Sequence, residues 1–412
     1  MTRQPSKDGG ADAVEPGPSG EAALLGHAVA RLYEAAETTA PASLSAMVDV
    51  LCEIVGARKG RLLVADYAVR SLHEVGPQGR IGQAEVIEGT LAGRVFADGK
   101  IVVSGLDPTL VRFPLLDGTE RIGMLELEFE SWDETVGRAL PNVVRTFVLL
   151  LISSRRYSDA WVRARRAQPM SAAAEMQWDL LPPLAATANE VSVAGILEPA
   201  YAIGGDSFDY ALNPRTLDFA IVDAVGHEMS AVLMAAAAIN GLRNIRREGM
   251  DLPAAYSQVD ELIATHFGRS RYVTGLFGSL EFETGVLRWI NAGHVLPMLV
   301  RNGTYAGELT CRPSMPMGLG GTVVQIGENA LQSGDRVLLY TDGIPESKSD
   351  EGEFFGTDRL ADYLVRATLE GVPVAETVRR LTANVVSFVR GSLKDDATMV
   401  LMEYRRQPHA PQ

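Results

Sequence analysis

The chain has 412 residues, of which 46% are hydrophobic and 22% are charged, and this is typical of a globular protein with two or three domains. Its 52 acidic residues outnumber the 38 basic ones, and the net charge of −14 argues against a dedicated nucleic-acid or anionic-membrane binder, which needs a basic surface. Two cysteines are too few for a disulfide framework or a cysteine-based zinc or iron–sulfur site. No apolar run approaches the length of a membrane span, and residues 1–20 lack the apolar stretch of a secretory signal, so we expect a cytoplasmic protein.

Residues 1–20 contain three prolines and four glycines among small polar residues, and we expect a disordered tail because they bury too little apolar surface to become ordered. After it, apolar residues at three- and four-residue spacing predict two helices within residues 21–56. Five strands are then predicted over residues 61–66, 86–88, 101–103, 111–114 and 123–129. A helix over residues 142–157 completes the pattern, so we predict a compact α+β domain over residues 21–152.

Two segments of this domain read TLAGRVFADGKIVV over residues 90–103 and FPLLDGTERIGMLELEFE over residues 113–130. With them the domain resembles a GAF sensor domain. The resemblance implies a domain that senses a signal, while the chain between residues 66 and 86 is short for the family, which argues against a roomy ligand pocket. His73 has no partner nearby in the sequence, so we interpret it as a surface histidine and not as a haem or metal ligand.

Residues 153–183 are predicted to form a helical linker to a second domain. The first half of this segment carries five arginines and one aspartate, which fits either a solvated helix face or an anion- or nucleic-acid-binding stripe, and the net charge of −14 favours the solvated helix. An apolar stripe at helical spacing consists of Phe147, Leu150, Leu151, Trp161, Met176, Leu180 and Leu181. It predicts a homodimer paired through this helix, and the alternative is a monomer whose stripe packs on its own domains.

From residue 184 to residue 404, strand-like segments are interleaved with helices. Strands are predicted over residues 191–197, 217–222, 273–282, 286–290, 297–300, 323–326, 336–340 and 397–404, and helices over residues 229–247, 253–267, 357–369 and 374–389. Because short connections between strands are typical of antiparallel sheets, we predict an α+β fold with two sheets between helices, an α-β-β-α sandwich. Residues 405–412 are a short tail.

Aspartates stand at the ends of several predicted strands. They are Asp206 after two glycines, Asp223, Asp342, and the pair Asp395 and Asp396 before the last strand. One aspartate beside a glycine after a strand indicates only a turn, but several in one domain can meet at one edge of a sheet. Carboxylates so close together repel one another unless a cation neutralises them. With no cysteine or histidine ligand set beside them, these oxygen ligands predict Mg²⁺ or Mn²⁺.

The motifs around these aspartates read, in chain order, GGDSFDY, DAVGHEMSAVLMA, NAGHVLPMLV, MGLG, LYTDGIPES, GEFFGTDRL and DDAT, within residues 176–404. In this order they resemble the PPM-type protein phosphatases, and more narrowly the bacterial branch named for the stage II sporulation phosphatase E. The resemblance implies a serine/threonine phosphatase with two Mn²⁺ or Mg²⁺ ions, held by Asp206, Asp223, Asp342, Asp395 and the backbone carbonyl of Ala224. Asp223 would bridge the two ions. Asp396 is a further candidate ligand, and Asp396 or Asp209 is a candidate partner of the ligands.

The same resemblance implies a substrate, a phosphorylated STAS-type anti-anti-sigma protein, whose dephosphorylation is controlled by the N-terminal sensor domain. The alternative is a pseudophosphatase, a signalling scaffold that keeps the fold without catalysis. All four expected ligand aspartates are present, which favours the enzyme.

Three other features have competing interpretations. Residues 52–58 fit the Cys-x₅-Arg spacing of thiol phosphatases, but a helical pattern precedes Cys52 where a phosphate-binding loop needs a strand, which argues against a thiol site. His227 and His294 are interpreted as hydrogen-bond donors that order loops, and the alternative role is a general acid. Glu228 stands where the family has glycine, and at a helix start it favours the helix dipole. We identify no arginine as a phosphate clamp.

Overall fold

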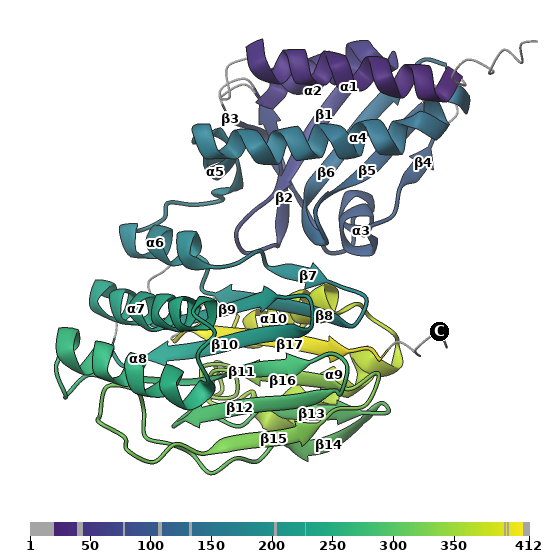
Figure 1. Ribbon diagram of the computed structural model, residues 1–412. Coiled ribbons are helices and arrows are strands. Elements are labelled where there is room, and N and C mark those ends of the chain that lie inside the picture. The colour runs from purple at the N-terminus through teal and green to yellow at the C-terminus, as the bar shows by residue number, and fades with distance from the viewer. Residues whose placement is uncertain are drawn as a thin grey trace, which may run out of the picture.

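The computed structural model describes residues 20–38, 44–76, 79–105, 109–131, 134–201, 204–226, 228–390, 393 and 395–406. Two domains follow one another along the chain and contact each other (Figure 1). Most of the two predicted tails, residues 1–20 and 405–412, lies outside the described residues.

The N-terminal domain is built on a six-stranded antiparallel sheet with the order β3-β2-β1-β6-β5-β4. Its strands are β1 (Lys59–Ala65), β2 (Ser71–Gly76), β3 (Gly79–Val86), β4 (Val102–Ser104), β5 (Thr109–Asp117) and β6 (Glu120–Phe129). Successive side chains of a strand point to opposite faces. Leu62 and Val64 of β1 therefore join one hydrophobic cluster, while Leu63 and Ala65 join the other.

Helices cover both faces of this sheet (Figure 1). One face carries α1 (Gly20–Thr38), α2 (Leu44–Val55) and α4 (Glu134–Ser154), and the other carries α3 (Leu91–Asp98). The segment that looked short for a GAF domain contains β2 and most of β3, which are rich in polar residues and so escaped the strand pattern. His73, on β2, is buried with its Nε2 2.9 Å from Ser71 Oγ, so the prediction of a surface histidine is wrong. The GAF resemblance itself stays a prediction.

Helix α4 contains a segment, Val136–Ser154, that is long and apolar enough to cross a membrane by length and composition alone. In this structure its apolar face packs on the sheet instead. Val143, Phe147 and Leu151 recur at four-residue spacing and are fully buried in the core of the N-terminal domain. The composition of α4 is therefore explained by its place as a core helix.

The connector is not the long helix that the sequence pattern predicts. It consists of a 3₁₀ turn (Arg155–Tyr157), α5 (Ala160–Arg165) and α6 (Ala172–Leu180), with non-helical residues between them. Trp161 of α5 packs into the N-terminal core and Leu180 of α6 packs into the C-terminal core. Much of the apolar stripe thus packs on the chain's own domains, as in the alternative to a helix paired with a second chain. Homodimerisation stays a prediction, without this stripe as its support.

Two antiparallel sheets form the centre of the C-terminal domain. One has the order β15-β12-β11-β10-β9, with β9 (Asp206–Leu212), β10 (Thr216–Ala224), β11 (Val273–Glu281), β12 (Val286–Ala292) and β15 (Ile326–Ala330). The other has the order β14-β13-β16-β17-β8-β7, with β7 (Ala185–Thr187), β8 (Val191–Glu198), β13 (Met298–Arg301), β14 (Thr304–Glu308), β16 (Arg336–Tyr340) and β17 (Ala397–Tyr404). Apolar residues of both sheets, such as Phe219 and Val400, form one core between them.

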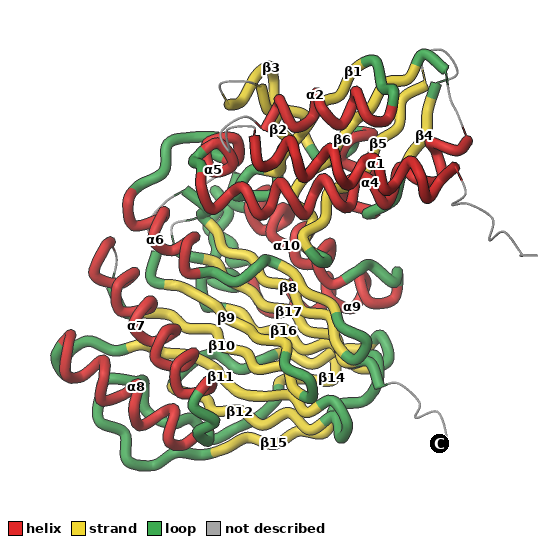
Figure 2. The backbone as a smooth tube through the Cα atoms, turned by 45° about the horizontal axis from the view of Figure 1, so that its top comes forward, coloured by secondary structure: helices red, strands yellow, loops and turns green. Residues whose placement is uncertain are grey.

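Helices α7 (Glu228–Arg247) and α8 (Leu252–Phe267) cover the outer face of the five-stranded sheet, and α9 (Gly356–Leu369) and α10 (Val374–Phe388) cover that of the six-stranded sheet (Figure 2). The predicted α-β-β-α sandwich is confirmed. Strand β15 lies at residues 326–330 and not at 323–326, because it is a polar edge strand without a clear apolar alternation. Strand β9 was not predicted, because it begins with the polar pair Asp206 and Ser207.

Candidate metal centre

The candidate site lies at one end of the sandwich, where strands of both sheets begin or end. Asp206 begins β9, and it is paired across the sheet with Asp223 near the end of β10. On β10, Ile221 packs between the two sheets and Val222 packs toward the helices, so strand alternation points Asp223 into the space between the sheets. On β9, Phe208 packs between the two sheets, so Asp206, two residues earlier, also points into this space.

The six-stranded sheet brings further carboxylates to the same end. Asp342 follows the end of β16, and Asp395 and Asp396 immediately precede β17. Because β16 and β17 are antiparallel neighbours, the end of one lies beside the start of the other. The candidate site is therefore divided between the sheets, and its geometry depends on how the two sheets are held together at this end.

A cavity of about 310 Å³ opens at this place. Its lining includes four of the predicted ligands, namely Asp223, Ala224, Asp342 and Asp395. The side chains of Asp342 and Asp395 are exposed and that of Asp223 is half-buried. Asp206 and Asp396 are buried and are not among the lining residues. The structure thus brings the predicted set together in two layers, one open to the cavity and one beneath it.

The buried layer is held by hydrogen bonds from different parts of the chain. The hydroxyl of Thr341 donates to Asp206 Oδ2 at 2.7 Å, and the N–H of Asp206 donates to Asp396 Oδ2 at 3.1 Å. The side-chain amide of Gln177, on α6, donates to the carbonyl oxygen of Asp206, so the connector touches the backbone of a predicted ligand. The sequence motifs did not indicate a role for Thr341 or Gln177. Strand alternation past Leu339, which faces the core between the sheets, is the signal that could have identified Thr341.

Burial and mutual repulsion shift the ionisation of these carboxylates. Burial raises the pKa of Asp223 to about 7, and the charges of Asp342, Asp395 and Asp396 add to the rise. Burial also raises the pKa of Asp206, followed by the charges of Asp223 and Asp396. The pKa of Asp396 rises to about 6, chiefly through burial. Repulsion of this kind is what divalent cations relieve, because they offset the negative charges directly.

Two glycines permit this close approach of strands and loops. A Cβ atom on Gly204 would overlap the carboxylate of Asp396, and a Cβ atom on Gly343 would overlap the carbonyl oxygen of Asp396. A Cβ atom at position 204 would therefore displace the Asp396 carboxylate, and one at position 343 would displace the backbone that leads into β17. The glycines beside Asp206 and Asp342 thus serve the packing of the site as well as local turns.

The comparisons with known proteins identify the family of this domain. Residues 213–405 match the model of the stage II sporulation protein E family, SpoIIE. The C-terminal domain is a SpoIIE domain. The resemblance predicted from the sequence motifs is therefore confirmed for this part of the chain.

Relatives of the SpoIIE domain are distant. Protein IcfG of Synechocystis sp. is 23% identical over 257 residues, which are 55% of this chain and 40% of that protein. The phosphoserine phosphatase RsbU of Bacillus subtilis is 18% identical over 238 residues, which are 56% of this chain and 68% of that protein. The chain thus matches less than half the length of IcfG. The solved structure of the RsbU and RsbW domains of Rv1364c from Mycobacterium tuberculosis is 25% identical, with a TM-score of 0.46, over 55% of this chain and 63% of that chain.

The donor set of the SpoIIE domain fits divalent cations of the Mg²⁺ and Mn²⁺ type. Its candidate ligands are carboxylate and carbonyl oxygens at a solvent-connected cavity, which are the donors these ions prefer. Within the described residues, no three His, Cys, Asp or Glu side chains are already gathered as a ligand set. Asp223, Asp342 and Asp395 line the cavity, and the side chains of Asp342 and Asp395 are exposed there.

His294 of the SpoIIE domain orders a loop, as predicted. Its Nε2 lies 3.1 Å from the carbonyl oxygen of Tyr340, which can only accept, so Nε2 carries the proton and Nδ1 accepts from the hydroxyl of Thr274 at 2.9 Å. Burial lowers the pKa of His294 to about 4. A neutral imidazole with both nitrogens engaged has no spare proton to give at pH 7, so the structure does not support a general acid here.

Asp209 does not belong to the site. It stands three residues after Asp206 on β9, so its side chain points to the opposite face of the sheet. There its carboxylate binds Arg243 at 2.7 Å and Arg246 at 2.9 Å, both from α7. Asp209 thus ties a helix to the sheet and is not a partner of the ligands. The predicted His227 lies outside the described residues.

The Cys-x₅-Arg segment is not a phosphate-binding loop. Cys52 lies in α2, and the chain runs from this helix to β1, which is the reverse of the order strand, loop, helix that cradles a phosphate. Cys52 is buried, and burial followed by the charge of Asp49 raises the pKa of its thiol to about 11. A thiol with so high a pKa is not a thiolate nucleophile at neutral pH.

Proposed function

We propose that this chain is a metal-dependent protein phosphatase that hydrolyses phosphoserine or phosphothreonine on a regulatory protein. The observation that carries the proposal is the meeting of carboxylates from both sheets at one cavity of a SpoIIE domain. The name of the relative RsbU, a phosphoserine phosphatase, supports the same reaction. No nucleophilic side chain is required for this chemistry, which agrees with the buried and protonated state of Cys52.

Two Mn²⁺ or Mg²⁺ ions would be held by Asp206, Asp223, Asp342, Asp395 and the carbonyl oxygen of Ala224. When bound, such ions lower the pKa of a water molecule toward neutrality and offset the charge of the phosphoryl oxygens. Asp223 lines the cavity from the five-stranded sheet and Asp342 lines it from the end of a strand of the six-stranded sheet, so the ions would be held between the two sheets. Asp396 would hold the backbone of Asp206 in place through its hydrogen bond to the Asp206 N–H.

We infer that the substrate is a phosphorylated STAS-type anti-anti-sigma protein of the cytoplasm, and that the chain acts in sigma-factor regulation. The support is the SpoIIE family and the relative RsbU. The alternative is a pseudophosphatase that binds the same partner without catalysis. The four ligand aspartates and their electrostatic strain favour the enzyme, because a scaffold has no need to keep mutually repelling carboxylates.

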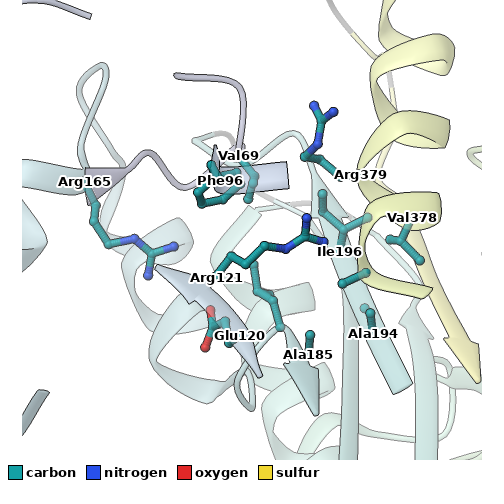
Figure 3. Close-up of a pocket in the computed structure, with 13 residues that line it drawn as sticks. Val69, Phe96, Glu120, Arg121, Arg165, Ala185, Ala194, Ile196, Val378 and Arg379 are labelled. Atoms are coloured by element: carbon teal, nitrogen blue, oxygen red, sulfur yellow. The ribbon is translucent and has the colours of Figure 1, made fainter. Parts of the chain in front are cut away.

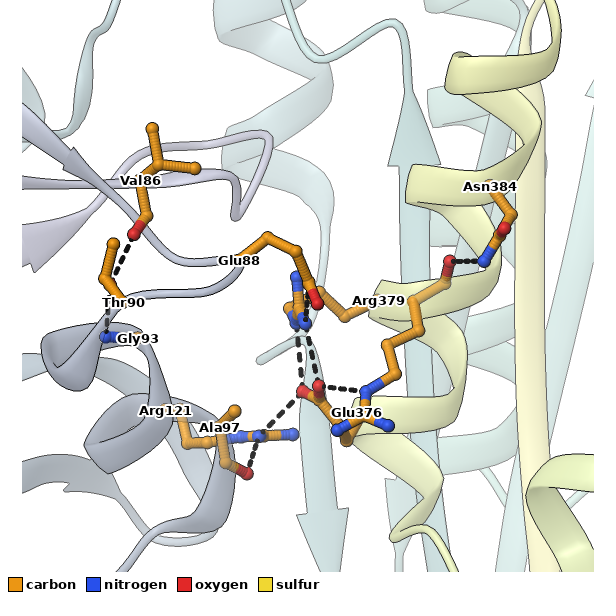
Figure 4. A network of polar contacts seen from close by, with 10 residues as sticks. Val86, Glu88, Thr90, Gly93, Ala97, Arg121, Glu376, Arg379 and Asn384 are labelled. Carbon is orange, nitrogen blue, oxygen red and sulfur yellow. Dashed lines mark hydrogen bonds and ion pairs between the residues drawn. The ribbon is translucent and has the colours of Figure 1, made fainter.

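We also propose that the GAF-like N-terminal domain controls the phosphatase, and the contacts between the domains support this (Figure 4). Glu376 of α10 is 2% exposed and binds Arg121 of β6 at 3.1 Å and Arg379 of its own helix at 2.7 Å. Arg379 in turn binds Glu88 of the N-terminal domain at 3.0 Å. The network therefore joins a strand of one domain to a helix of the other through a buried carboxylate.

Beside this network lies a small cavity of about 40 Å³ whose lining comes from both domains (Figure 3). Phe96 and Arg121 line it from the N-terminal domain, and Ile196 and Val378 line it from the SpoIIE domain. The side chains that line this space come from both domains, so a displacement of Phe96 or Arg121 would act directly on β8 and α10.

A second contact leads toward the metal centre. Arg165 of α5 lies 4.4 Å from the centroid of the Tyr67 ring, and Trp178 of α6 lies 4.7 Å from the same ring. The indole N–H of Trp178 donates to the carbonyl oxygen of Ala200 at 2.7 Å, in the segment that leads to Asp206. This cluster links the loop after β1 to the start of β9, and it is a physical route by which the N-terminal domain can bias the site.

The catalytic proposal is tested by phosphate release from a phosphoserine protein with Mn²⁺ and with a chelator. Asp223→Asn and Asp342→Asn should each abolish Mn²⁺-dependent hydrolysis in folded protein, because each removes a ligand charge. Asp218→Asn is the matched control, since it makes the same change at the other end of β10, where Asp218 accepts from Asn213 and Thr216. More than about a tenth of wild-type activity in both site variants would refute the metal centre. A wild-type chain that binds Mn²⁺ and the substrate without releasing phosphate would establish the pseudophosphatase instead.

The regulatory proposal is tested by Arg121→Met in the full chain. Loss of the Arg121–Glu376 ion pair should change basal phosphatase activity at least threefold while the variant stays folded. Arg138→Met is the control, because Arg138 is an exposed arginine of α4 that pairs only loosely with Glu21 and Glu134. Equal activity of wild type, Arg121→Met and Arg138→Met would contradict control through this contact.

A further inference from the structure

The candidate metal centre is divided between two sheets, so something must fix the separation of its two halves. Asp206 and Asp223 belong to the five-stranded sheet, while Asp342 and Asp395 follow or precede strands of the six-stranded sheet. The N–H of Asp206 already joins the sheets through its hydrogen bond to Asp396, but the carboxylates of the two halves repel one another. A neutral group that joins the sheets at this end is therefore of particular interest, and Thr341 is such a group.

The hydroxyl of Thr341 has a defined orientation. Thr341 is 1% exposed and follows directly after β16. Its Oγ1 accepts a hydrogen bond of 3.0 Å from the N–H of Thr398 on β17. A hydroxyl has one proton. Because the Thr398 N–H already donates to the hydroxyl oxygen, the hydroxyl donates its own proton to Asp206 Oδ2 at 2.7 Å. The hydroxyl thus connects a backbone N–H of the six-stranded sheet to a carboxylate of the five-stranded sheet.

The backbone around this hydroxyl is also fixed. The N–H of Thr341 donates to the carbonyl oxygen of Thr398 at 3.0 Å, so the two threonines form a reciprocal pair. Gly343 packs against the backbone of Asp396 so closely that no Cβ would fit. Thr341 therefore sits on a rigid support, one residue before the predicted ligand Asp342, and has little freedom to move without its neighbours.

We propose that Thr341 is a positioning residue for the metal centre, whose hydroxyl holds the Asp206 carboxylate against the six-stranded sheet and so sets the spacing of the two halves of the site. This inference rests on the proposed function, since it assigns a role toward the divalent cations of the proposed phosphatase. Groups that hold a metal ligand in orientation typically contribute 10- to 100-fold to metal affinity. Thr341 does not touch substrate in this role and acts through Asp206.

The test uses the full chain and the substitutions Thr341→Val and Thr341→Ser. Valine keeps the shape of threonine and lacks the hydroxyl, whereas serine keeps the hydroxyl. Mn²⁺ binding is measured by isothermal titration calorimetry, and phosphate release is measured over a range of Mn²⁺ concentrations. We expect Thr341→Val to raise the Mn²⁺ dissociation constant by about tenfold or more and to regain activity at high Mn²⁺. Thr341→Ser should stay within about threefold of wild type, because the same donor is restored.

Two controls separate positioning from general stability. Thr382→Val removes a buried hydroxyl of α10 that donates to the carbonyl oxygen of Val378 in the same helix and lies 4.0 Å from Met399 Sδ, so it should leave Mn²⁺ affinity unchanged. Thermal unfolding in the presence of a chelator compares the stability of the variants without metal. If Thr341→Val unfolds below the assay temperature, Thr341→Ala replaces it, with the same expected loss of affinity.

The outcomes distinguish this inference from the proposed function. A wild-type chain that binds no Mn²⁺ would overturn the proposed phosphatase, and this inference with it. A wild-type chain that binds Mn²⁺ while Thr341→Val binds it within threefold of wild type would overturn the role of Thr341 alone. Equal loss of affinity in Thr341→Ser and Thr341→Val would also overturn it, because the hydroxyl would then not be the cause.

Discussion

Glu376 offers the sharpest test of the contact between the domains. Its carboxylate accepts hydrogen bonds from Arg379 at 2.9 and 2.7 Å, from Arg380 at 2.6 Å and from Arg121 of the N-terminal domain at 3.1 Å. Burial raises the pKa of Glu376, but the hydrogen bonds and charges of the three arginines outweigh it and hold the pKa below its usual 4.5. Glu376 is therefore a buried anion that neutralises guanidinium groups from two domains.

The substitution Glu376→Gln keeps the shape of the side chain and removes its charge. Arg121 and Arg379 are 11% and 8% exposed, so both would lose a charged partner in a poorly solvated place. Removal of one partner from a buried ion pair costs about 3–5 kcal/mol of folding free energy. Arg379 keeps Glu88, and glutamine keeps one acceptor oxygen, so we expect the lower end of this range, about 3 kcal/mol. Arg380 is 42% exposed and adds little.

The assay is urea unfolding of the full chain, followed by circular dichroism at several pH values. Since the folded pKa of Glu376 is depressed, its contribution is fully present above the unfolded pKa of about 4.5 and is lost as the pH falls through the lower folded pKa. The difference between wild type and Glu376→Gln should thus be constant from pH 8 to pH 5 and should shrink below about pH 4. Glu353→Gln is the control, because Glu353 is 65% exposed and its pair with Arg359 is worth at most about 1 kcal/mol. A Glu376→Gln difference no larger than that of the control would refute this reasoning.

Three further substitutions probe the thiol, the close packing beneath the site and the buried histidine. Cys52→Ser should leave phosphate release unchanged. If this variant lost activity while the activity of wild type survived a chelator, the catalytic domain would be misassigned. Gly343→Ala should lower Mn²⁺ affinity and the thermal unfolding temperature, because its Cβ would overlap the backbone of Asp396, and an unaltered variant would contradict the packing. His294 has a folded pKa of about 4 against 6.5 in the unfolded chain, so the unfolded state takes up a proton first as the pH falls. Wild type should therefore lose up to about 3 kcal/mol of stability between pH 6.5 and pH 4 relative to His294→Gln, measured by urea unfolding at both pH values.

The helices and most strands of the SpoIIE domain were predictable because their sequence periods are strong. The four predicted helices of this domain lie within two residues of α7, α8, α9 and α10. The missed or misplaced strands, β7, β9, β14 and β15, are short, polar or exposed, so their pairing depends on tertiary neighbours more than on a local pattern. In the N-terminal domain, β2 and β3 escaped prediction for the same reason.

The connector failed as a prediction for a different physical reason. Its helical spacing predicted one long helix, yet α5 packs on one domain and α6 on the other. The apolar residues Trp161 and Leu180 find more burial in two separate cores than along one exposed helix, and tertiary packing outweighs local propensity in such cases. The sequence pattern could not show which surface each residue would meet.

Aspartates beside apolar strands indicated a carboxylate site, and the resemblance of the surrounding motifs to the PPM-type phosphatases supplied the candidate ligands. The sequence also held the information that excludes Asp209, since an odd spacing from Asp206 on one strand puts the two side chains on opposite faces. The sequence did not show which carboxylates open to the cavity and which lie beneath it, nor that Thr341 joins the two halves, because these features follow from tertiary packing. These features arise from contacts between sheets whose residues are more than a hundred positions apart, and no local pattern encodes such a distance.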